Sequence, residues 1–143
     1  MREDEAVPAR VTARIEVPRG SFIKQELHGD APRVDFISPV PCPFNYGYVP
    51  ALAGADGDPL DAVVLGPRLA VGAEVQRPVV AVVRFWDAGQ VDDKLVLSEA
   101  PLSPAEATAL RAFFRLYGFA RRWLNRLRGA RGPTGYAGLS VVD

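Results

Sequence analysis

Short apolar segments that end at glycine or proline fill most of the chain, and a single helical pattern follows them near the C-terminus. Residues 11–17 and 23–28 alternate apolar and polar side chains, which is typical of half-buried strands. Residues 62–65 and 78–86 are continuous apolar runs, the second with one arginine, as expected of buried strands. Several short strands followed by one helix predict a mainly β, α+β fold, in which a small β-barrel carries an attached helix.

The helix is predicted to begin at a capping box. Ser103 is a good N-cap, Pro104 suits the first helical position, and Glu106 can bond back to the backbone of the cap. Apolar residues then recur at helical spacing, and Gly118 is expected to interrupt the pattern. Arginines occupy the remaining faces; a solvated basic surface is their default interpretation, and a phosphate-binding role stays open for one or two of them. A glycine-rich stretch from Gly129 ends the helix, and a short tail follows it.

Three connections between the predicted strands have a distinctive composition. Residues 39–43 contain three prolines, which exclude a helix or a central strand and predict an extended segment at the rim of the barrel. Residues 45–48 predict a turn that carries two tyrosine hydroxyls. Residues 87–94 predict an acidic loop with an apolar strand on either side, which would give the loop a rigid base.

A second acidic loop has three carboxylates within residues 56–61, whose sequence is DGDPLD. Gly57 allows unusual backbone angles and Pro59 fixes its own φ, so the segment is short and stiff. Clustered carboxylate oxygens are the ligands that Mg²⁺ and Mn²⁺ prefer. Taken alone, this hexapeptide describes a solvated turn better than a metal site. The choice between the two depends on the rest of the chain.

The composition restricts the class of protein. A length of 143 residues predicts one domain over residues 1–143. Seventeen basic and seventeen acidic residues cancel, so no global field attracts nucleic acid or membrane, and neither is an expected partner. A lone cysteine, Cys42, and a lone histidine, His28, provide neither a disulfide framework, a zinc cluster nor a histidine-based metal site, and a cytoplasmic location is expected.

The order of these motifs resembles the soluble (family I) inorganic pyrophosphatases. The matching motifs come in family order over roughly residues 11 to 100. They are Ile15-Glu16-Val17-Pro18, Ile23-Lys24-Gln25-Glu26, Ser38-Pro39-Val40, Asn45-Tyr46-Gly47-Tyr48, the DGDPLD hexapeptide and residues 87–94. The resemblance implies an OB-like five-stranded β-barrel with a C-terminal helix, whose mouth holds several Mg²⁺ ions, with Mn²⁺ as an alternative metal. It also implies an inorganic diphosphatase that hydrolyses pyrophosphate to two phosphates with metal-activated water, and a homo-oligomer, commonly a hexamer.

The resemblance assigns a role to each matching residue. The implied metal ligands are Asp56, Asp61 and Asp92 for a tight pair of ions, Asp87 beside Asp92 for a substrate-borne ion, and Glu16 and Glu26 for a further cation. The implied general base is Asp58, the residues that contact the attacked phosphoryl group are Lys24, Tyr46 and Lys94, and the residue that contacts the departing phosphate is Tyr117. Fifteen of the seventeen basic residues are arginines, yet both lysines fall on family phosphate positions.

The chain departs from the family pattern on the side of the leaving phosphate. Val34 stands where the family has an arginine, with Arg33 one place early, and Gly118 stands where it has a lysine. Cys42 replaces a tyrosine, and Ala88 replaces a glutamate near the metals. The resemblance also describes the chain as a divergent, C-terminally shortened member whose arginine-rich residues 118–131 lack a family counterpart. Losing two charged contacts removes about 1.5–3 kcal/mol each from phosphate binding unless other groups replace them.

Three hypotheses follow from these motifs. The first is a working pyrophosphatase in which Arg33, Arg121 or Arg122 supplies the missing cation. The second is a hydrolase of another diphosphate compound with a bulkier or less charged leaving group. The third is a non-catalytic paralogue that binds metal, phosphate or a partner; a nucleic-acid-binding barrel is disfavoured, because a carboxylate-lined groove has the wrong sign for a phosphate backbone. The first is preferred, because every metal carboxylate and both lysines are present.

Overall fold

The computed structural model describes the backbone of residues 7–21, 23–28, 31–37, 41–54 and 57–142, and the side chains of these residues outside 23–37. Asp56, predicted as a metal ligand, lies outside the described residues, and the side chains of Lys24, Glu26, Arg33 and Val34 lie outside the described side chains. The elements are β1 (Arg10–Val17), β2 (Ile23–His28), β3 (Ala31–Ile37), β4 (Asn45–Ala53), β5 (Pro59–Val64), β6 (Glu74–Asp87), β7 (Gln90–Val91), β8 (Lys94–Leu97), α1 (Pro104–Leu127) and β9 (Gly135–Val141).

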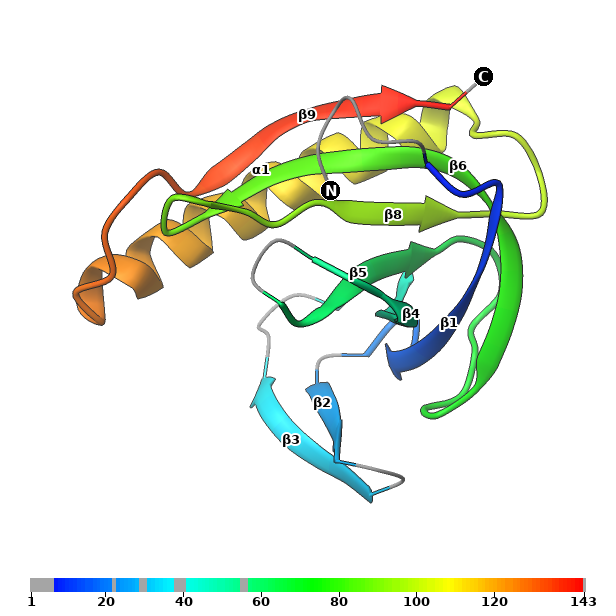
Figure 1. Ribbon diagram of the computed structural model, residues 1–143, viewed down its shortest axis with the longest axis horizontal. Coiled ribbons are helices and arrows are strands. Elements are labelled where there is room, and N and C mark those ends of the chain that lie inside the picture. Colours follow the sequence, from blue (N-terminus) through cyan, green and yellow to red (C-terminus); the bar gives the residue numbers. More distant parts are fainter. Residues whose placement is uncertain (1–6, 22, 29–30, 38–40, 55–56, 143) are drawn as a thin grey trace.

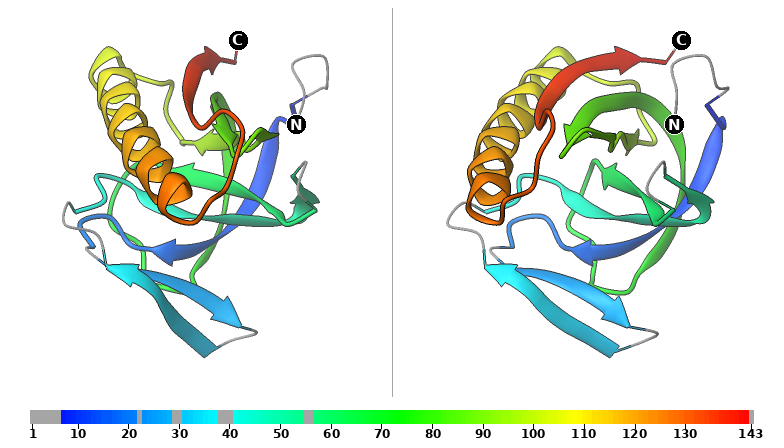
Figure 2. Two further views of the ribbon diagram at one scale, coloured as in Figure 1. Left: turned by 90° about the vertical axis from the view of Figure 1, so that its left-hand side faces the viewer. Right: turned by 60° about the vertical axis from the view of Figure 1, so that its left-hand side comes forward.

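Five strands form a closed barrel. They follow the order β1-β4-β5-β8-β6, and β6 pairs back with β1 to close the sheet (Figure 1). The pair β5–β8 is parallel, and the other four pairs of the barrel are antiparallel. The hairpin β2–β3 stands apart from the barrel, whereas α1 lies against its side together with β9 (Figure 2). The predicted small barrel with an attached C-terminal helix is therefore confirmed.

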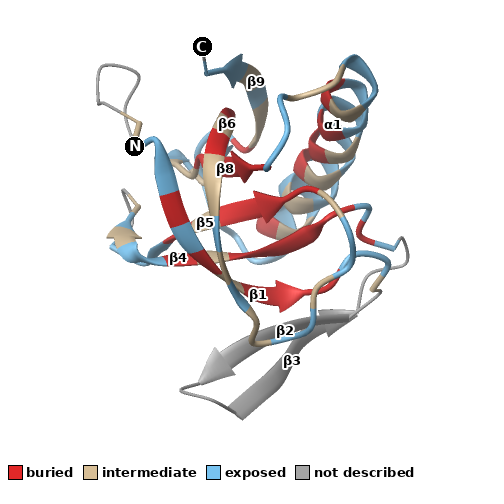
Figure 3. Cartoon of the chain, turned by 90° about the vertical axis from the view of Figure 1, so that its right-hand side faces the viewer, coloured by how far each residue is buried: buried red, intermediate tan, exposed pale blue. Residues whose placement is uncertain are grey.

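The continuous apolar runs arise because β5, β8 and the middle of β6 are covered on both faces. Along β5, Ala62 and Val64 face the interior of the barrel, and Val63 faces the layer under α1. The same alternation separates Leu95 from Val96 on β8. Side chains that point to either face of these strands are thus removed from water, as the red segments in Figure 3 show.

The helix begins at the predicted capping box, in which Ser103 and Glu106 exchange side-chain and backbone hydrogen bonds. The predicted interruption at Gly118 is wrong, because α1 continues without a break to Leu127. A Cβ at position 118 would lie 3.0 Å from the Cα of Gly135 and 3.0 Å from the amide nitrogen of Tyr136. Glycine is therefore needed at this position for close packing of α1 on β9, and it does not end the helix.

The predicted turn at residues 45–48 is also wrong, because these residues are the first part of β4. The polar groups that suggest a turn are satisfied by neighbouring segments instead. The Oδ1 atom of Asn45 accepts hydrogen bonds from the amides of Arg19 and Leu69, at 3.0 and 2.8 Å. A Cβ on Gly47 would lie 1.9 Å from the carbonyl oxygen of Arg14, so glycine allows β1 to pair closely with β4.

The predicted tail after the helix contains a strand. The strand β9 pairs with the second half of β6, from Ala81 opposite Val141 to Trp86 opposite Gly135. The strand β6 therefore pairs with β1 near its start and with β8 and β9 further on. Within the part of the chain that the structure describes, no helix is both long and apolar enough to cross a membrane.

Candidate active site

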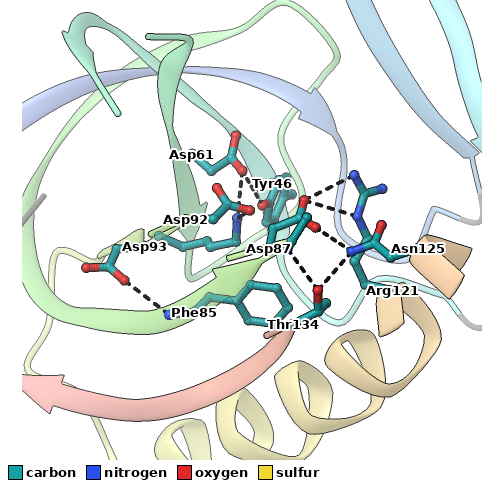
Figure 4. A network of polar contacts seen from close by, with 11 residues as sticks. Tyr46, Asp61, Phe85, Asp87, Asp92, Asp93, Arg121, Asn125 and Thr134 are labelled. Atoms are coloured by element: carbon teal, nitrogen blue, oxygen red, sulfur yellow. Dashed lines mark hydrogen bonds and ion pairs between the residues drawn. The ribbon is translucent and has the colours of Figure 1, made fainter. Parts of the chain in front are cut away.

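A fully buried lysine lies at the centre of the candidate site. The Nζ atom of Lys94 contacts Oδ2 of Asp61 at 2.8 Å and Oδ2 of Asp92 at 2.8 Å (Figure 4). The strand pairing explains this contact, because Asp61 on β5 and Lys94 on β8 are opposite each other in the parallel ladder. Two carboxylates thus share one ammonium group, and the three groups together carry a net negative charge.

Tyr46 completes this cluster from β4. Its hydroxyl donates a hydrogen bond to Oδ2 of Asp61 at 3.0 Å. Burial, and then the negative charge of Asp61, raise the pKa of Tyr46 well above its ordinary value. The tyrosine therefore keeps its proton and remains a hydrogen-bond donor at neutral pH.

The pKa values of the charged partners follow from burial and from their mutual contacts. Burial alone would lower the pKa of Lys94, but the charges of Asp61 and Asp92 outweigh it and raise the pKa. Burial raises the pKa of Asp92, and Lys94 opposes part of that rise while Asp61 and Asp87 add to it. Lys94 thus stays protonated, and an additional cation near Asp92 would be electrostatically favoured.

The carboxylate oxygens of this cluster fit a hard divalent cation. Asp61 and Asp92 are both partly exposed, at 31% and 26% of their side chains, so an ion can reach them from solvent. Among the described residues, no group of three or more acidic, histidine or cysteine side chains has metal-binding geometry. Asp56, the third ligand that the resemblance implies, lies outside that set.

A second cluster forms where Asp87 meets the helix. Its Oδ2 atom accepts hydrogen bonds from Nε of Arg121 at 3.2 Å, and the Nη2 atom of the same arginine lies 3.1 Å away. Its Oδ1 atom accepts a hydrogen bond from Nδ2 of Asn125 at 2.8 Å. Burial would raise the pKa of Asp87, but the bonds from Asn125 and Arg121 outweigh it and lower the pKa below its ordinary value.

Thr134 connects this second cluster to the turn after β6. Its Oγ1 atom accepts a hydrogen bond from Nδ2 of Asn125 and another from the amide of Ala88, both at 2.9 Å. Ala88 has a positive φ of 49° in this turn. A Cβ on Gly132 would lie 2.7 Å from the carbonyl carbon of Ala88, so the segment between α1 and β9 packs tightly on the same turn.

Sequence reasoning did not identify Asn125 or Thr134. Both side chains are buried, with exposures of 6% and 7%. Asn125 is seven residues after Gly118 and lies on the same face of α1. A polar residue on the buried face of a helix is the sequence signal that could have drawn attention to it.

The adjacent Asp93 does not belong to the site. It points away from Asp92 in Figure 4, and its Oδ2 atom pairs with Nη1 of Arg84 at 2.9 Å. Its Oδ1 atom accepts a hydrogen bond from the amide of Phe85 at 3.1 Å. Asp92 alone of this acidic pair joins the lysine cluster.

The remaining candidates lie on different elements. Glu16 is buried in β1, Tyr117 is half-buried on α1 against Phe85, and Asp58 is exposed in the loop before β5. In the β2–β3 hairpin, Glu26 is opposite Arg33. The structure therefore brings together Tyr46, Asp61, Asp92 and Lys94, places Asp87 with Arg121, and leaves the contacts of Lys24, Glu26 and Asp56 outside the described part.

The described geometry defines a class of protein: a closed five-stranded barrel with a C-terminal helix and a carboxylate–lysine cluster built from β5 and β8. The family model for inorganic pyrophosphatases matches residues 13–120. The chain therefore belongs to the soluble inorganic pyrophosphatase family, as the order of its motifs suggests.

Individual relatives agree with this assignment. Soluble inorganic pyrophosphatase 2 of Chlamydomonas reinhardtii is 41% identical over 98 residues, which cover 65% of this chain and 51% of that protein. The inorganic pyrophosphatase of Gluconobacter oxydans is 33% identical over 95 residues, covering 63% and 55%. This chain thus spans about half the length of the curated relatives it matches.

Solved structures extend the likeness to nearly the whole chain. The inorganic pyrophosphatase of Thermus thermophilus superposes with a TM-score of 0.78 at 25% identity, covering 99% of this chain and 87% of that chain. The enzyme of that name from Neisseria gonorrhoeae gives a TM-score of 0.74 at 26% identity, covering 93% and 83%. The barrel, the helix and the last strand are therefore all features of this fold.

Proposed function

We propose that this protein hydrolyses inorganic pyrophosphate to two phosphates in a Mg²⁺-dependent reaction. The observation that supports this most strongly is the buried Lys94, shared by Asp61 and Asp92 in a chain of this family. Asp61 and Asp92, with Asp56, would hold a pair of divalent cations, and Asp87, Glu16 and Glu26 would contribute to further ions. Mg²⁺ suits these oxygen ligands, Mn²⁺ is an alternative, and the ions would neutralise the substrate and activate the attacking water.

The protein side chains would then position and stabilise the reacting phosphoryl group. Lys94 has three N–H donors, of which two are directed at Asp61 and Asp92 in the described structure. Because the lysine is fully buried, it would donate to a phosphoryl oxygen once these two carboxylates turn toward the bound metal ions. Tyr46 remains protonated and can shift its hydrogen bond from Asp61 to the substrate. Lys24 would contact the same phosphoryl group from β2.

Asp58 would act as the general base. It lies exposed in the loop between β4 and β5, where water reaches it. The water oxygen forms a bond to one phosphorus atom and gives a proton to Asp58, while the bond from that phosphorus to the bridging oxygen breaks. The bridging oxygen leaves with the electron pair as part of the second phosphate, beside Tyr117.

Phosphate release from pyrophosphate tests this proposal. We expect turnover with Mg²⁺, loss of turnover on chelation, and a drop of at least about 100-fold in kcat for Asp58→Asn. Glu99→Gln is the matched control, because Glu99 is an exposed acid that pairs with Arg77 away from the cluster. No turnover of any substrate by the wild type would support the non-catalytic paralogue instead.

Gly118 favours a second candidate, a hydrolase of another diphosphate compound. The close approach of β9 excludes any longer side chain at this position, so the lysine that the resemblance implies for the departing phosphate has no counterpart there. A panel of diphosphate esters, assayed beside pyrophosphate, separates the two functions. Turnover of esters without turnover of pyrophosphate would establish the second.

We also propose a homo-oligomer, a hexamer by family resemblance, in the cytoplasm. The outward face of α1 carries an apolar stripe that a second copy of the chain could cover. It consists of Leu116, Phe119, Trp123 and Leu127, with exposures of 52%, 58%, 52% and 82%. Their spacing of three and four residues is the pattern with which helices pack on each other.

A further inference from the structure

The charge distribution of the site leaves one guanidinium without a role in the proposed hydrolysis. Among the described residues, two cations contact the carboxylates of the site: Lys94 on Asp61 and Asp92, and Arg121 on Asp87. Pyrophosphate has two phosphoryl groups, one on each side of its bridging oxygen. The proposed hydrolysis assigns Lys94 to the attacked group, so a second cation is needed for the group that leaves.

We propose that Arg121 binds the leaving phosphate and that Asp87 and Asn125 hold its guanidinium in place for this purpose. The inference rests on the proposed hydrolysis of pyrophosphate. Arg121 is four residues after Tyr117, which places both side chains on the same face of α1. Its guanidinium contacts Asp87, and Figure 4 shows it on the Asp87 side of the cluster that Tyr46, Asp61 and Asp92 form with the lysine.

The guanidinium has donors left for a ligand. Arginine has five N–H groups in a planar fork, and the contacts of Nε and Nη2 with Asp87 use two of them. The side chain of Arg121 is 32% exposed, so the remaining donors can be reached from solvent. A planar fork with several free donors matches phosphate oxygens better than a single ammonium does.

The support beneath this pair is more extensive than a surface ion pair requires. Asn125 is buried, and both of its amide hydrogens are used, one on Asp87 and one on Thr134. Burying an amide costs free energy unless it is fully hydrogen-bonded, whereas an exposed ion pair contributes little to stability. Asn125 therefore fixes the orientation of Asp87, and Asp87 in turn fixes the orientation of the Arg121 guanidinium (Figure 4).

The neighbouring arginine has a different role. Arg122 is exposed, and its Nε atom donates to the backbone carbonyl of Thr134 at 3.1 Å. That contact holds the segment before β9 and turns the guanidinium toward the loop. Of the two helix arginines that sequence analysis left open, the geometry therefore selects Arg121.

The test measures phosphate binding and steady-state kinetics in the full-length protein with saturating Mg²⁺. We expect Arg121→Ala to raise KM for pyrophosphate and the Kd for inorganic phosphate by about 10- to 100-fold. Arg121→Lys keeps the charge but not the fork, and an intermediate effect is expected. Arg111→Ala is the matched control, because Arg111 is an exposed arginine ten residues, or about 15 Å, earlier on the same helix.

A double-mutant cycle tests the positioning role of Asn125. If Asn125 acts through Arg121, Asn125→Ala raises the Kd for phosphate in the wild-type background and has little further effect in Arg121→Ala. Equal effects in both backgrounds would mean that Asn125 only stabilises the fold. Circular dichroism melting curves confirm that each variant is folded.

Three outcomes are informative. A Kd for phosphate that changes less than twofold in Arg121→Ala would overturn the inference. A changed Mg²⁺ requirement with unchanged phosphate affinity would also overturn it, because the ion pair would then serve Asp87 as a metal ligand. If the wild type binds phosphate through Arg121 but does not hydrolyse pyrophosphate, the proposed function fails while the binding role of Arg121 stands.

Discussion

The buried Lys94 compensates two carboxylates, and its removal has a specific expected consequence. Lys94→Met leaves Asp61 and Asp92 side by side without a cation. Because both acids are partly exposed, we expect a loss of about 2–3 kcal/mol in the free energy of unfolding in EDTA, below the 3–5 kcal/mol for a fully buried pair. Mg²⁺ should stabilise the variant more than the wild type, since the uncompensated acids bind the ion more tightly.

The control for this prediction is Arg84→Met, which breaks the ion pair with Asp93 outside the site. Arg84→Met should be destabilised in EDTA but gain no more from Mg²⁺ than the wild type does. Urea titrations of the three proteins, each with EDTA and with Mg²⁺, provide the measurement. Equal gains in the two variants would argue against a cation site at Asp61 and Asp92.

Cys42 is expected to be chemically inert in the folded protein. The side chain is buried, and burial raises the pKa of its thiol above the ordinary value, so little reactive thiolate exists at pH 7 to 8. A colorimetric thiol reagent should therefore modify Cys42 slowly in buffer and rapidly in urea. Fast modification of the folded protein would mean that residues 41–44 open readily.

At the scale of elements, the packing of α1 on β9 reverses a usual rule. Replacing a helical glycine by alanine normally stabilises by about 1 kcal/mol. For Gly118→Ala we expect a loss of about 1–3 kcal/mol, because the new Cβ meets the backbone of β9 at 3.0 Å. Thr108→Ala, at an exposed position of the same helix, should be neutral or slightly stabilising in the same urea titration.

Some of the strands and the start of the helix could be predicted from the sequence, whereas other elements could not. Alternation identified β1 and β2, apolar runs identified β5, β6 and β8, and the capping box identified the start of α1. The strand β9 has two glycines and weak alternation, and it is formed by pairing with the edge of β6. The turn expected at residues 45–48 failed because Asn45 finds its partners on distant segments.

The candidate site also contains some features that the sequence predicted and one that it did not. The family resemblance placed Tyr46, Asp61, Asp92 and Lys94 in one site, and the structure brings these side chains together. The register puts Asp61 opposite Lys94 in the β5–β8 ladder, whereas Tyr46 and Asp92 join the cluster through their side-chain contacts. The pairing of Asp87 with Arg121 joins residues 34 apart in the chain and depends on how α1 packs against the turn after β6. No local pattern encodes that packing, so the choice among the arginines required the structure.

At the scale of the whole molecule, the apolar stripe on α1 leads to a test of assembly. Phe119→Glu with Trp123→Glu places two charges in the stripe, and we expect the particle mass to fall toward that of a monomer. Val71→Glu, at an exposed apolar residue of a distant loop, is the control and should keep the wild-type mass. Light scattering after size-exclusion chromatography measures both. An unchanged mass in the double variant would place any interface elsewhere.

The closure of the barrel by β1 and β6 has a consequence for synthesis of the protein. Arg10 is opposite Pro78, and Asp61 is opposite Lys94, so neither the β1–β6 pair nor the β5–β8 pair can form until much of the chain has been made. A ribosome releases β1, β4 and β5 before their partners β6 and β8, and their apolar faces stay open to water during that interval. Nascent chains of this protein should therefore depend on chaperones until residue 97 has left the exit tunnel.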